Sequence, residues 1–367
     1  MSISLENKSD KNPIKLLHLY SEDIFKKYIC LTFENKTFSN DYIFIKNIYK
    51  KINFDDYAIV FVHSLNSDMV NYLNNNIINI PVVWFFYGAD GFVLGKFYNI
   101  FLENKTKFLR ARLEFKFGFR RGFLQLIKCV FPLLMDKTKK NKLLLKQINK
   151  FRLIVPVMPN DFLLLKENYH ITSECFHLNY INPVFLENTT NEITGNNILL
   201  GNSASFANNH IEAIDILSKM ELLNRNIIIP LNYGNSEIRN YISTYAKKRL
   251  GENHIEVLET FIPFDEYHKI ILSCDVVIMN HKRQQALGNI VQALISGAHL
   301  FLNSSSPIFQ FLTENDFYVT AFNDKSIISG LEYDKKIHNY YKTIKIFGPE
   351  KQRKSIKLLI NKVIEKE

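Results

Sequence analysis

Short apolar runs recur along this chain, and most are followed by a polar turn and then by a stretch with helical spacing. The clearest case is Asn197–Leu200, which is followed by the polar loop Gly201–His210 and then by Ile211–Leu217. In that last stretch the apolar residues recur at the three- to four-residue spacing of one helix face. Strands that alternate with helices in this way predict α/β domains built on parallel, doubly wound sheets.

The loop Gly201–His210 combines a glycine, several polar side chains and the expected start of a helix. We expect Asn209 to cap that helix and Glu212 to complete a capping box three residues later. The first turn of a helix offers unpaired N–H groups and the positive end of the helix dipole to an anion. A phosphate-binding loop is therefore one interpretation, and an ordinary strand-to-helix turn is the other.

The chain has 367 residues, enough for two domains of ordinary size. Hydrophobic residues make up 47% and charged residues 22%, which is typical of folded globular proteins. The scattered cysteines Cys30, Cys129, Cys175 and Cys274 favour unpaired thiols in a reducing cytosol over a disulfide framework or a zinc site. The polar N-terminus does not resemble a signal peptide, and no apolar run reaches the roughly 18 residues of a membrane span.

Most of the net charge of +10 is concentrated in one segment, Lys96–Cys129. Nine basic residues against Glu103 and Glu114 give it a charge of +7. Such a mixture of basic and aromatic side chains suits the headgroup region of an anionic membrane leaflet. Nucleic acid is a rival partner, and a solvated helix with a phenylalanine-rich core face is the plainest alternative. The interleaved aromatic residues are Phe97, Tyr98, Phe101, Phe108, Phe115, Phe117, Phe119 and Phe123.

Three expected strands in the first half carry a polar side chain at or near their carboxyl ends, namely His18, His63 and Asp90. Because the carboxyl ends of parallel strands lie on one edge of a sheet, these side chains are expected to converge on one crevice. A polar residue that merely caps its own strand is the alternative for each. The strands expected in this half are Ile14–Tyr20, Tyr42–Ile45, Ala58–Val62, Pro81–Phe86, Leu153–Met158 and Phe176–Tyr180.

A polar stretch that contains proline and glycine, Asn182–Asn196, predicts the linker between two domains. We expect an N-terminal acceptor-binding and membrane-facing domain over 1–185 and a nucleotide-sugar-binding domain over 186–340. Residues 341–367 are expected to form a basic C-terminal helix. The strands expected in the second half are Asn197–Leu200, Asn226–Leu231, His254–Leu258, Asp275–Met279 and Leu300–Leu302.

Polar residues also follow an expected strand of the second half. Arg283, Gln284 and Gln285 precede a helix that is expected to start at Gly288-Asn289. An arginine beside helix N–H groups suits a pyrophosphate, and glutamine side chains can bond sugar hydroxyls. The chain has no P-loop motif and no G-x-G-x-x-G after its first strand, which argues against a dinucleotide oxidoreductase.

Four segments taken together resemble glycosyltransferase family 56. They are GNSASFANNH at 201–210, PLNYG at 230–234, FIPFDEYHKIILSCD at 261–275 and RQQALGNIVQALISG at 283–297. In the first half, positions similar to those of the family are occupied by His18, Asp23, His63, Trp84 and Gly88-Ala89-Asp90. The resemblance extends over roughly residues 14–311. It implies an α/β protein of GT-B architecture, with two Rossmann-like doubly wound domains facing each other across a cleft.

The resemblance further implies a bacterial enzyme that transfers a deoxyamino or acetamido-deoxy hexose from a dTDP-sugar to a polyprenyl-pyrophosphate-linked saccharide. The family includes a Fuc4NAc transferase of enterobacterial common antigen synthesis, and O-antigen synthesis is a related setting. The implied location is peripheral, on the cytoplasmic face of the bacterial inner membrane, with residues 96–128 on the anionic surface. Within the family pattern, Ala204–Ala207 interrupt the loop, Ala286 replaces a glycine and Asn289 replaces a threonine. We expect the specificity of this chain to be determined there.

Glycosyl transfer needs a stabilised leaving diphosphate, a base for the acceptor hydroxyl and two substrates held in line. We assign the leaving group to Gly201-Asn202-Ser203, Arg283 and the helix start at Gly288. Asp90 is our first choice for the base, with His18 and His63 as alternatives. No cofactor and no metal ion is expected, because GT-B enzymes generally need none and no D-x-D motif is present. The other expected donor contacts are His210, Tyr233, Gly234, Phe261, Tyr267, Gln284, Gln285 and Asn289.

Two functions of other classes fit parts of this sequence. One is a non-catalytic sugar-nucleotide-binding protein of a polysaccharide operon, and the other is a nucleic-acid-binding α/β protein. The retained Arg283-Gln284-Gln285 and the three strand-end groups argue against the first. The clustering of charge with phenylalanine in one segment argues against the second, so no nucleic-acid partner is expected.

Overall fold

The chain forms two compact units in the computed structural model, which describes residues 13–22, 24–33, 37–47, 52–97, 99–131, 134, 137–178, 181, 186, 192–222 and 225–365. Unit 1 is drawn from residues 1–95, 133–183 and 349–367. Unit 2 is drawn from residues 96–132 and 184–348. Each unit therefore combines segments that lie far apart in the sequence.

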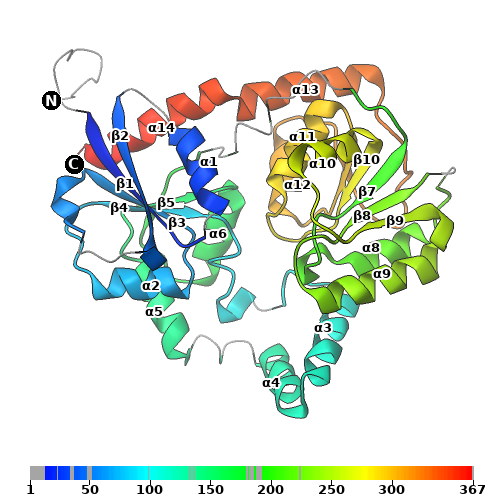
Figure 1. The fold of residues 1–367 in the computed structure, drawn as a ribbon, viewed down its shortest axis with the longest axis horizontal. Helices are drawn as coiled ribbons and strands as arrows, with labels where there is room; N and C mark the ends of the chain where they lie inside the picture. Colours follow the sequence, from blue (N-terminus) through cyan, green and yellow to red (C-terminus); the bar gives the residue numbers. More distant parts are fainter. Residues whose placement is uncertain are drawn as a thin grey trace. The chain divides into compact units, whose positions relative to one another are not determined.

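Unit 1 contains a parallel sheet of six strands in the order β2-β1-β3-β4-β5-β6 (Figure 1). The strand order reverses between β1 and β3, which pair directly. Most side chains of the central strands are fully buried, because both faces of the sheet are covered by helices. The strands are β1 (Ile14–Tyr20), β2 (Phe38–Phe44), β3 (Ile59–His63), β4 (Val82–Phe86), β5 (Leu153–Pro156) and β6 (Glu174–Cys175).

The last helix of the chain completes the core of unit 1. In Figure 1 this helix, α14 (Pro349–Ile364), lies beside α1 (Ile24–Phe33). Its Ile356, Leu359 and Ile360 are buried in the same cluster as the side chains of β1, β3 and β4. The remaining helices of the unit are α2 (Ser67–Asn75), α5 (Lys139–Ile148) and α6 (Pro159–Asn168), with short 3-10 turns at Ile45–Asn47 and Phe54–Asp56.

Unit 2 contains a second parallel six-stranded sheet, in the order β12-β11-β10-β7-β8-β9. Here the order reverses between β7 and β10. The strands are β7 (Asn197–Leu200), β8 (Ile227–Pro230), β9 (Ile255–Leu258), β10 (Cys274–Met279), β11 (His299–Leu302) and β12 (Thr320–Ala321). The described helices that follow β7 along the chain in this unit are α8 (His210–Leu217), α9 (Ser236–Leu250), α10 (Phe264–Leu272), α11 (Leu287–Ser296), α12 (Pro307–Glu314) and α13 (Tyr333–Phe347).

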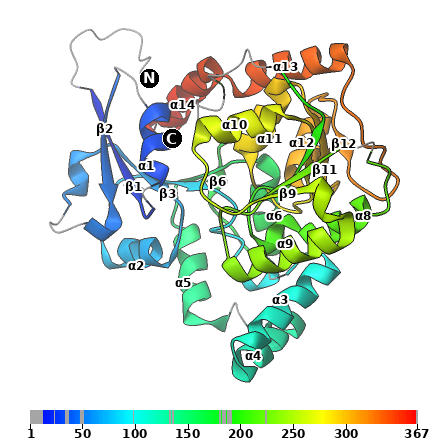
Figure 2. The same cartoon turned by 45° about the vertical axis from the view of Figure 1, so that its right-hand side comes forward.

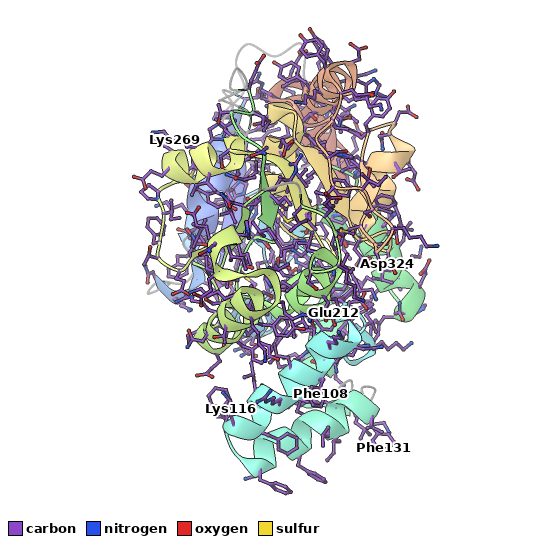
Figure 3. The ribbon with its side chains drawn as sticks, turned by 90° about the vertical axis from the view of Figure 1, so that its right-hand side faces the viewer. Phe108, Lys116, Phe131, Glu212, Lys269 and Asp324 are labelled. Atoms are coloured by element: carbon purple, nitrogen blue, oxygen red, sulfur yellow. The ribbon has the colours of Figure 1, made fainter. Side chains whose placement is uncertain are left out.

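The basic aromatic segment forms a pair of helices, α3 (Asn104–Lys116) and α4 (Phe119–Val130), that belongs to unit 2. Leu109 and Leu113 of α3 are buried with the core residues of β7, β8 and α8. Figure 3 shows Glu212 of α8 next to α3, and Phe108 and Phe131 at the surface of the helical pair. We call residues 99–131 the helical pair below.

The strands and helices agree closely with the sequence expectations in the central parts of both sheets. β1 and β7 have the predicted bounds, and most other strands differ by one or two residues at their ends, but β2 begins at Phe38 and not at Tyr42. The strand predicted at 176–180 is an exception, because the pairing with β5 is made by Glu174 and Cys175 instead, and residues 179 and 180 lie outside the described residues. Much of the predicted linker, at 182–185 and 187–191, also lies outside them. The division into acceptor and donor halves stays a prediction.

Every helix within the described part of the chain is too short or too polar to cross a bilayer. Cys30, Cys175 and Cys274 are free thiols, as the sequence predicts.

Candidate active site

Several of the residues singled out from the sequence lie at the switch points of the two sheets. In open parallel sheets, ligands bind outside the carboxyl ends of the strands, where the strand order reverses. That place is between β1 and β3 in unit 1 and between β7 and β10 in unit 2. Each unit therefore has one switch point of this kind, and each is described by itself.

A pocket of about 550 Å³ opens at the switch point of unit 1. It is lined by Glu22, which follows β1, by Ser64–Ser67, which follow β3, and by Ala89 and Asp90, which follow β4. The first residues of α5, Lys139 and Lys140, complete one side. Of the three candidate bases from the sequence, only Asp90 lines this pocket.

The side chain of Asp90 is buried, and one of its two carboxylate oxygens, Oδ2, accepts two hydrogen bonds. Its Oδ2 accepts hydrogen bonds from the backbone N–H of Leu65 and from Nε1 of Trp84, both at 3.0 Å. Oδ1 is buried and has no partner of hydrogen-bond geometry among the described residues. Burial raises the pKa of Asp90 to about 6, against the lowering effect of these bonds. A carboxylate with a pKa near neutrality suits a general base.

His18 and His63 lie together, but inside the sheet. Both side chains are fully buried, and Nδ1 of His18 is 3.0 Å from Nε2 of His63. Burial lowers the pKa of His18 to about 3 and lowers the pKa of His63 well below its ordinary value. Both rings are therefore neutral at physiological pH and sealed from a substrate hydroxyl, so the geometry favours Asp90 as the base.

The protons of the two rings are fixed by their partners. Asn40 donates its amide to the carbonyl of Phe33 at 3.1 Å, which turns its Oδ1 toward Nε2 of His18 at 3.1 Å. His18 must then carry its proton on Nε2 and accept at Nδ1, so that His63 donates from Nε2. The hydroxyl of Tyr87, 3.3 Å from Nδ1 of His63, is consequently the donor at the end of this row.

In unit 2, the loop after β7 is held by the side chain of Asn208. Its Oδ1 accepts from the backbone N–H of Asn202 at 3.1 Å and faces Nε2 of His281 at 2.7 Å. Its Nδ2 donates to the carbonyl of Ser203 at 2.9 Å. Gly201 has φ +72°, and a Cβ there would lie 2.5 Å from Nε2 of the buried His210. The sequence Gly201-Asn202-Ser203 is therefore a rigid turn in which a glycine is required.

Asn209 stands at the N-cap position of α8, as expected, but the expected capping box with Glu212 does not form. Asn209 precedes α8 with φ +48°, but its side chain makes no cap bond. It donates instead to the carbonyls of Phe101 and Asn280, both at 3.1 Å, and accepts from the N–H of Glu103 at 2.8 Å. Glu212 likewise turns away from its own helix. These side chains serve the docking of α3, which local sequence patterns do not reveal.

Glu212 caps the neighbouring helix α3. Its two carboxylate oxygens accept from the backbone N–H of Thr106 at 2.8 Å and from the Thr106 hydroxyl at 2.6 Å. Thr106 lies in the first turn of α3, where N–H groups have no acceptor within the helix. The loop after β7 and the helical pair are therefore joined at two adjacent places.

The loops after β7 and β10 meet at the switch point. Nε2 of Gln285 donates to Oδ1 of Asn202 at 2.9 Å. Nη1 of Arg283 bonds the carbonyl of Gln284 at 3.3 Å, and Gln284 itself is buried. The helix α11 begins directly afterwards, so the first-turn N–H groups at Gly288 have no acceptor within that helix. Amides, a guanidinium and a helix start thus come together, which suits a diphosphate.

Charge at this crevice comes from Arg283 and not from histidine. Burial lowers the pKa of His210 to about 4. Burial, together with the positive charge of Arg283 and the nearby imidazole of His210, lowers the pKa of His281 to about 3. Both imidazoles are neutral at physiological pH, so they can order the loop but cannot attract an anion.

Two exposed aromatic rings follow β8 and β9. Tyr233 and Phe261 are 52% and 71% exposed and meet edge to face at 6.3 Å between ring centroids. Gly234 next to them has φ +107°, and a Cβ there would lie 2.3 Å from the carbonyl oxygen of Ala204. Exposed rings on a fixed turn can stack on a nucleobase.

Tyr267 and Phe206 have packing roles. The Tyr267 hydroxyl accepts from Nδ2 of Asn289 at 3.0 Å, which places both residues in the contact between α10 and α11. Phe206, in the part of the loop where we expected specificity, packs against the core of unit 2 and lies 5.9 Å from the guanidinium of Arg110 in α3. This departure from the family pattern is used, at least in part, to hold α3.

Sequence reasoning missed several residues of the two crevices. Asn208 and His281 are buried polar residues whose partners are distant in sequence, so no local pattern identified them. Lys139 and Lys140 did leave a recognisable pattern, since two lysines at a helix start oppose the helix dipole. Within the described residues, no group of three or more His, Cys, Asp or Glu side chains is close enough together to hold a metal ion.

Comparison with known proteins identifies a family for one region of the chain. Residues 175–350 match the model of the family described as 4-alpha-L-fucosyltransferase glycosyl transferase group 56. This region belongs to glycosyltransferase family 56. The resemblance seen in the sequence motifs is thereby confirmed, and with it the assignment of the chain to the glycosyltransferases.

Solved structures with the same fold cover nearly the whole chain. A glycosyltransferase from Rickettsia africae has a TM-score of 0.58 at 11% identity, covering 97% of this chain and 100% of that one. A UDP-forming alpha,alpha-trehalose-phosphate synthase from Burkholderia vietnamiensis has a TM-score of 0.59 at 7% identity, covering 95% and 100%. The Anabaena protein HepE, solved in complex with UDP and glucose, has a TM-score of 0.52 at 10% identity, covering 96% and 98%. At such identities the likeness shows the fold alone, and it confirms the GT-B architecture.

Proposed function

We propose that this family 56 glycosyltransferase transfers a deoxyamino or acetamido-deoxy hexose from a dTDP-sugar to a polyprenyl-pyrophosphate-linked saccharide in bacterial surface polysaccharide synthesis. The observation that carries the proposal is the bond between Asn202 and Gln285, which joins the loops after β7 and β10 next to Arg283 and the start of α11. This crevice lies within the residues matched by the family. The description of the family names fucosyl transfer, and fucose is a deoxyhexose, which supports a deoxy-sugar donor.

In this proposal unit 2 binds the nucleotide. The first-turn N–H groups of α11 and the guanidinium of Arg283 stabilise the negative charge of the departing diphosphate. Tyr233 and Phe261 contact the nucleobase, and Gln285 and Asn202 bond the diphosphate or the transferring sugar. HepE, which shares the fold, was solved with UDP and glucose, which supports a nucleotide diphosphate as the leaving group.

Unit 1 supplies the base. Asp90 takes the proton from the acceptor hydroxyl as that oxygen attacks the anomeric carbon of the donor and the bond to the diphosphate breaks. Its raised pKa keeps the proton affinity of the carboxylate close to what neutral pH requires. His18 and His63 then have an indirect role, because their hydrogen bonds fix the direction of the Tyr87 hydroxyl, which directly follows β4.

The helical pair is proposed to hold the enzyme on the cytoplasmic face of the inner membrane. Phe119 and Phe123 of α4 are exposed and stack on each other at 6.3 Å between ring centroids. Arg120, Arg121 and Lys128 are exposed on the same helix. Exposed aromatic rings beside cationic side chains favour an anionic headgroup layer.

The nucleotide is tested by calorimetry and by thermal shift with dTDP, UDP and GDP. We expect dTDP to give the largest stabilisation, because ligand binding to the folded state raises its unfolding temperature. Arg283→Ala is expected to weaken dTDP binding about tenfold or more through loss of a charge-assisted contact. Lys269→Ala, on the exposed face of α10, is the matched control and is expected to bind like the wild type. Equal responses to all three nucleotides, or an unchanged Arg283→Ala affinity, would contradict the donor assignment.

A further inference from the structure

Two helices of unit 1 begin at the same pocket. Asn66, the N-cap of α2, and Ser67, its first residue, line the pocket after β3. Lys139 and Lys140, the first two residues of α5, line it from the other side. Figure 2 shows α2 and α5 side by side, and contacts between them agree with this view. The positive ends of two helix dipoles are therefore directed to one crevice.

The first turn of α5 carries an unusual charge. It contains Lys139 and Lys140 and no acidic residue, although a cation at that end of a helix is unfavourable by about 0.3–1 kcal/mol. Glu22 also lines the pocket but is exposed at its rim. Asp68 in the first turn of α2 does not line it and lies 3.9 Å from Lys46. A bound anion would offset the repulsion between the lysines and the dipole of α5.

A second, independent feature points to a ligand in the same pocket. The side chain of Asp90 is nine-tenths buried, and its Oδ1 accepts no hydrogen bond of good geometry from the described residues, although the backbone N–H groups of Tyr87 and Asp90 lie near enough to the carboxylate to lower its pKa. Buried polar atoms are almost always partnered, so an unpartnered one next to an open pocket indicates a missing partner. A hydroxyl group of a bound ligand would supply the missing donor.

The remaining wall of the pocket is apolar. Val70 of α2, Val93 after β4, and Leu143 and Leu144 of α5 line it. Leu143 lies one turn beyond Lys139 on the same helix face, so one face of α5 presents cations first and apolar side chains next. A ligand that fills this pocket should be anionic at one end and apolar along one side.

We propose that the pocket of unit 1 binds a phosphate-bearing ligand with an apolar portion. Its anion lies against Lys139, Lys140 and the first turns of α2 and α5, its apolar portion lies along Leu143 and Val70, and a hydroxyl bonds Asp90. The inference rests on the proposed function only in taking unit 1 as the acceptor-binding half. It adds a phosphate subsite and the residues that form it.

The test is calorimetry of the full chain with three probes, namely geranyl pyrophosphate, inorganic pyrophosphate and geraniol. Saturating dTDP is present throughout, so that the crevice of unit 2 does not compete for pyrophosphate. Geranyl pyrophosphate is expected to bind about tenfold or more tightly than either of the other probes. Only this probe has both a pyrophosphate to contact the two lysines and an apolar chain to contact Leu143 and Val70. Affinities for pyrophosphate and geranyl pyrophosphate that agree within twofold would overturn the apolar half of the proposal.

Variants locate the subsite. The double variant Lys139→Gln with Lys140→Gln is expected to lose about tenfold in affinity for both phosphate probes. Leu143→Asn is expected to lower the affinity for geranyl pyrophosphate and to leave the affinity for inorganic pyrophosphate unchanged. Lys142→Gln removes one positive charge from an exposed position of α5 that does not line the pocket, and it is expected to bind like the wild type.

Two outcomes would overturn the subsite. One is a loss of affinity in Lys142→Gln as large as in the double lysine variant, which would indicate general charge attraction. The other is wild-type affinity in the double variant. The donor proposal is judged separately, because dTDP affinity is expected to be unchanged in the lysine variants and reduced in Arg283→Ala. The ratio of the affinities for geranyl pyrophosphate and for inorganic pyrophosphate distinguishes a site for a lipid-like phosphate from a site for a soluble one.

Discussion

The side-chain amide of Asn209 donates to the carbonyl of Phe101, 108 positions earlier in the sequence. Its Oδ1 accepts from the N–H of Glu103, and Nζ of Lys282 lies 3.1 Å from Oε1 of Glu103. The start of the helical pair is thus bonded to the loops after β7 and β10. In the proposed enzyme the membrane-contacting helices are built directly onto the nucleotide-binding crevice.

Asn209→Ala is expected to lower the free energy of unfolding by about 2–4 kcal/mol. It leaves the carbonyls of Phe101 and Asn280 and the N–H of Glu103 without these bonds, at about 1–3 kcal/mol for an unsatisfied buried group. It also places alanine at φ +48°. Urea unfolding measures the change. Asn209→Gly removes the same bonds without the backbone strain, so it should be less destabilised than Asn209→Ala; wild-type stability in both variants would refute the bonding role.

Asp90→Asn is expected to change stability in a pH-dependent way. Burial raises the pKa of Asp90 from 3.8 to about 6, so the folded state binds the proton more tightly than the unfolded state. Between about pH 4 and pH 6 the stability of the wild type therefore falls as the pH rises, by roughly 3 kcal/mol in all. Asparagine has no such titration. The stability of Asp90→Asn relative to the wild type should rise across this window, as measured by thermal unfolding at pH 4 and pH 7.

The same variant tests the base. Transfer by Asp90→Asn is expected to fall by about 10²–10⁴-fold, the usual contribution of a general base, while dTDP affinity stays within twofold of the wild type. Product formation and calorimetry are the two measurements. Wild-type turnover in Asp90→Asn would show that another group removes the proton.

The two buried histidines are expected to be neutral with their protons on Nε2. This follows from the row of Asn40, His18, His63 and Tyr87, in which Asn40 can only accept from His18. Nitrogen-15 NMR of the imidazole rings at pH 6 to 8 measures the tautomers directly. Asn40→Leu is the matched perturbation and should release the fixed tautomer of His18. A proton on Nδ1 of either ring in the wild type would contradict this assignment.

Ala286→Gly is expected to stabilise unit 2 by about 1 kcal/mol. Ala286 precedes α11 in the left-handed region, with φ +56° and ψ 30°. That conformation costs an L-residue about 1–2 kcal/mol, whereas glycine adopts it freely, and this relief outweighs the roughly 0.4–1 kcal/mol of extra chain entropy that glycine loses on folding. Ala246→Gly, within α9, is the control and should destabilise. A lower urea midpoint for Ala286→Gly than for the wild type would mean that the alanine methyl has a packing role that outweighs the strain.

Replacing Phe119 and Phe123 by serine is expected to reduce binding to anionic vesicles. The two rings are 78% and 52% exposed, and each buried ring contributes about 1.5–3 kcal/mol on transfer from water. Flotation with phosphatidylglycerol-containing vesicles at physiological salt is the measurement, with a nucleic-acid shift assay alongside. Ile77→Ser, at a residue 86% exposed in unit 1, is the control. A shift of nucleic acid without flotation would favour the rival partner.

Much of the fold followed from local patterns. β1 and β7 have the bounds expected from apolar runs, because a strand buried on both faces of a parallel sheet is an almost continuous apolar run in the sequence. The two-residue strand β12 and the short strand β6 were missed or misplaced, since a two-residue pairing leaves no periodicity to detect. The candidate site residues near strand ends could be identified as well, because they lie at or near the ends of these predicted apolar runs.

Local patterns failed where a side chain serves a distant partner. Asn209 and Glu212 have the spacing of a capping box, yet both bond to the helical pair. Residues 96–128 precede the predicted linker by many positions, yet they pack with α8 in unit 2. Phe206 lies in the stretch where specificity is expected, and the local pattern gave no sign that it also contacts Arg110 of α3. In each case the deciding partner is about a hundred residues away.

By itself the sequence determined the two parallel sheets, their strand-end loops and the family, because these depend on periodicity, on turn chemistry and on short motifs that act locally. Only the tertiary structure decided which of the candidate bases lines a pocket. His18 and His63 lie within β1 and β3, whose side chains are covered on both faces of the sheet, whereas Asp90 lies in the loop after β4 and lines the pocket. The strand order decided the rest, since it brings Asn202 beside Gln285 and Lys139 beside Asp90 at the two switch points.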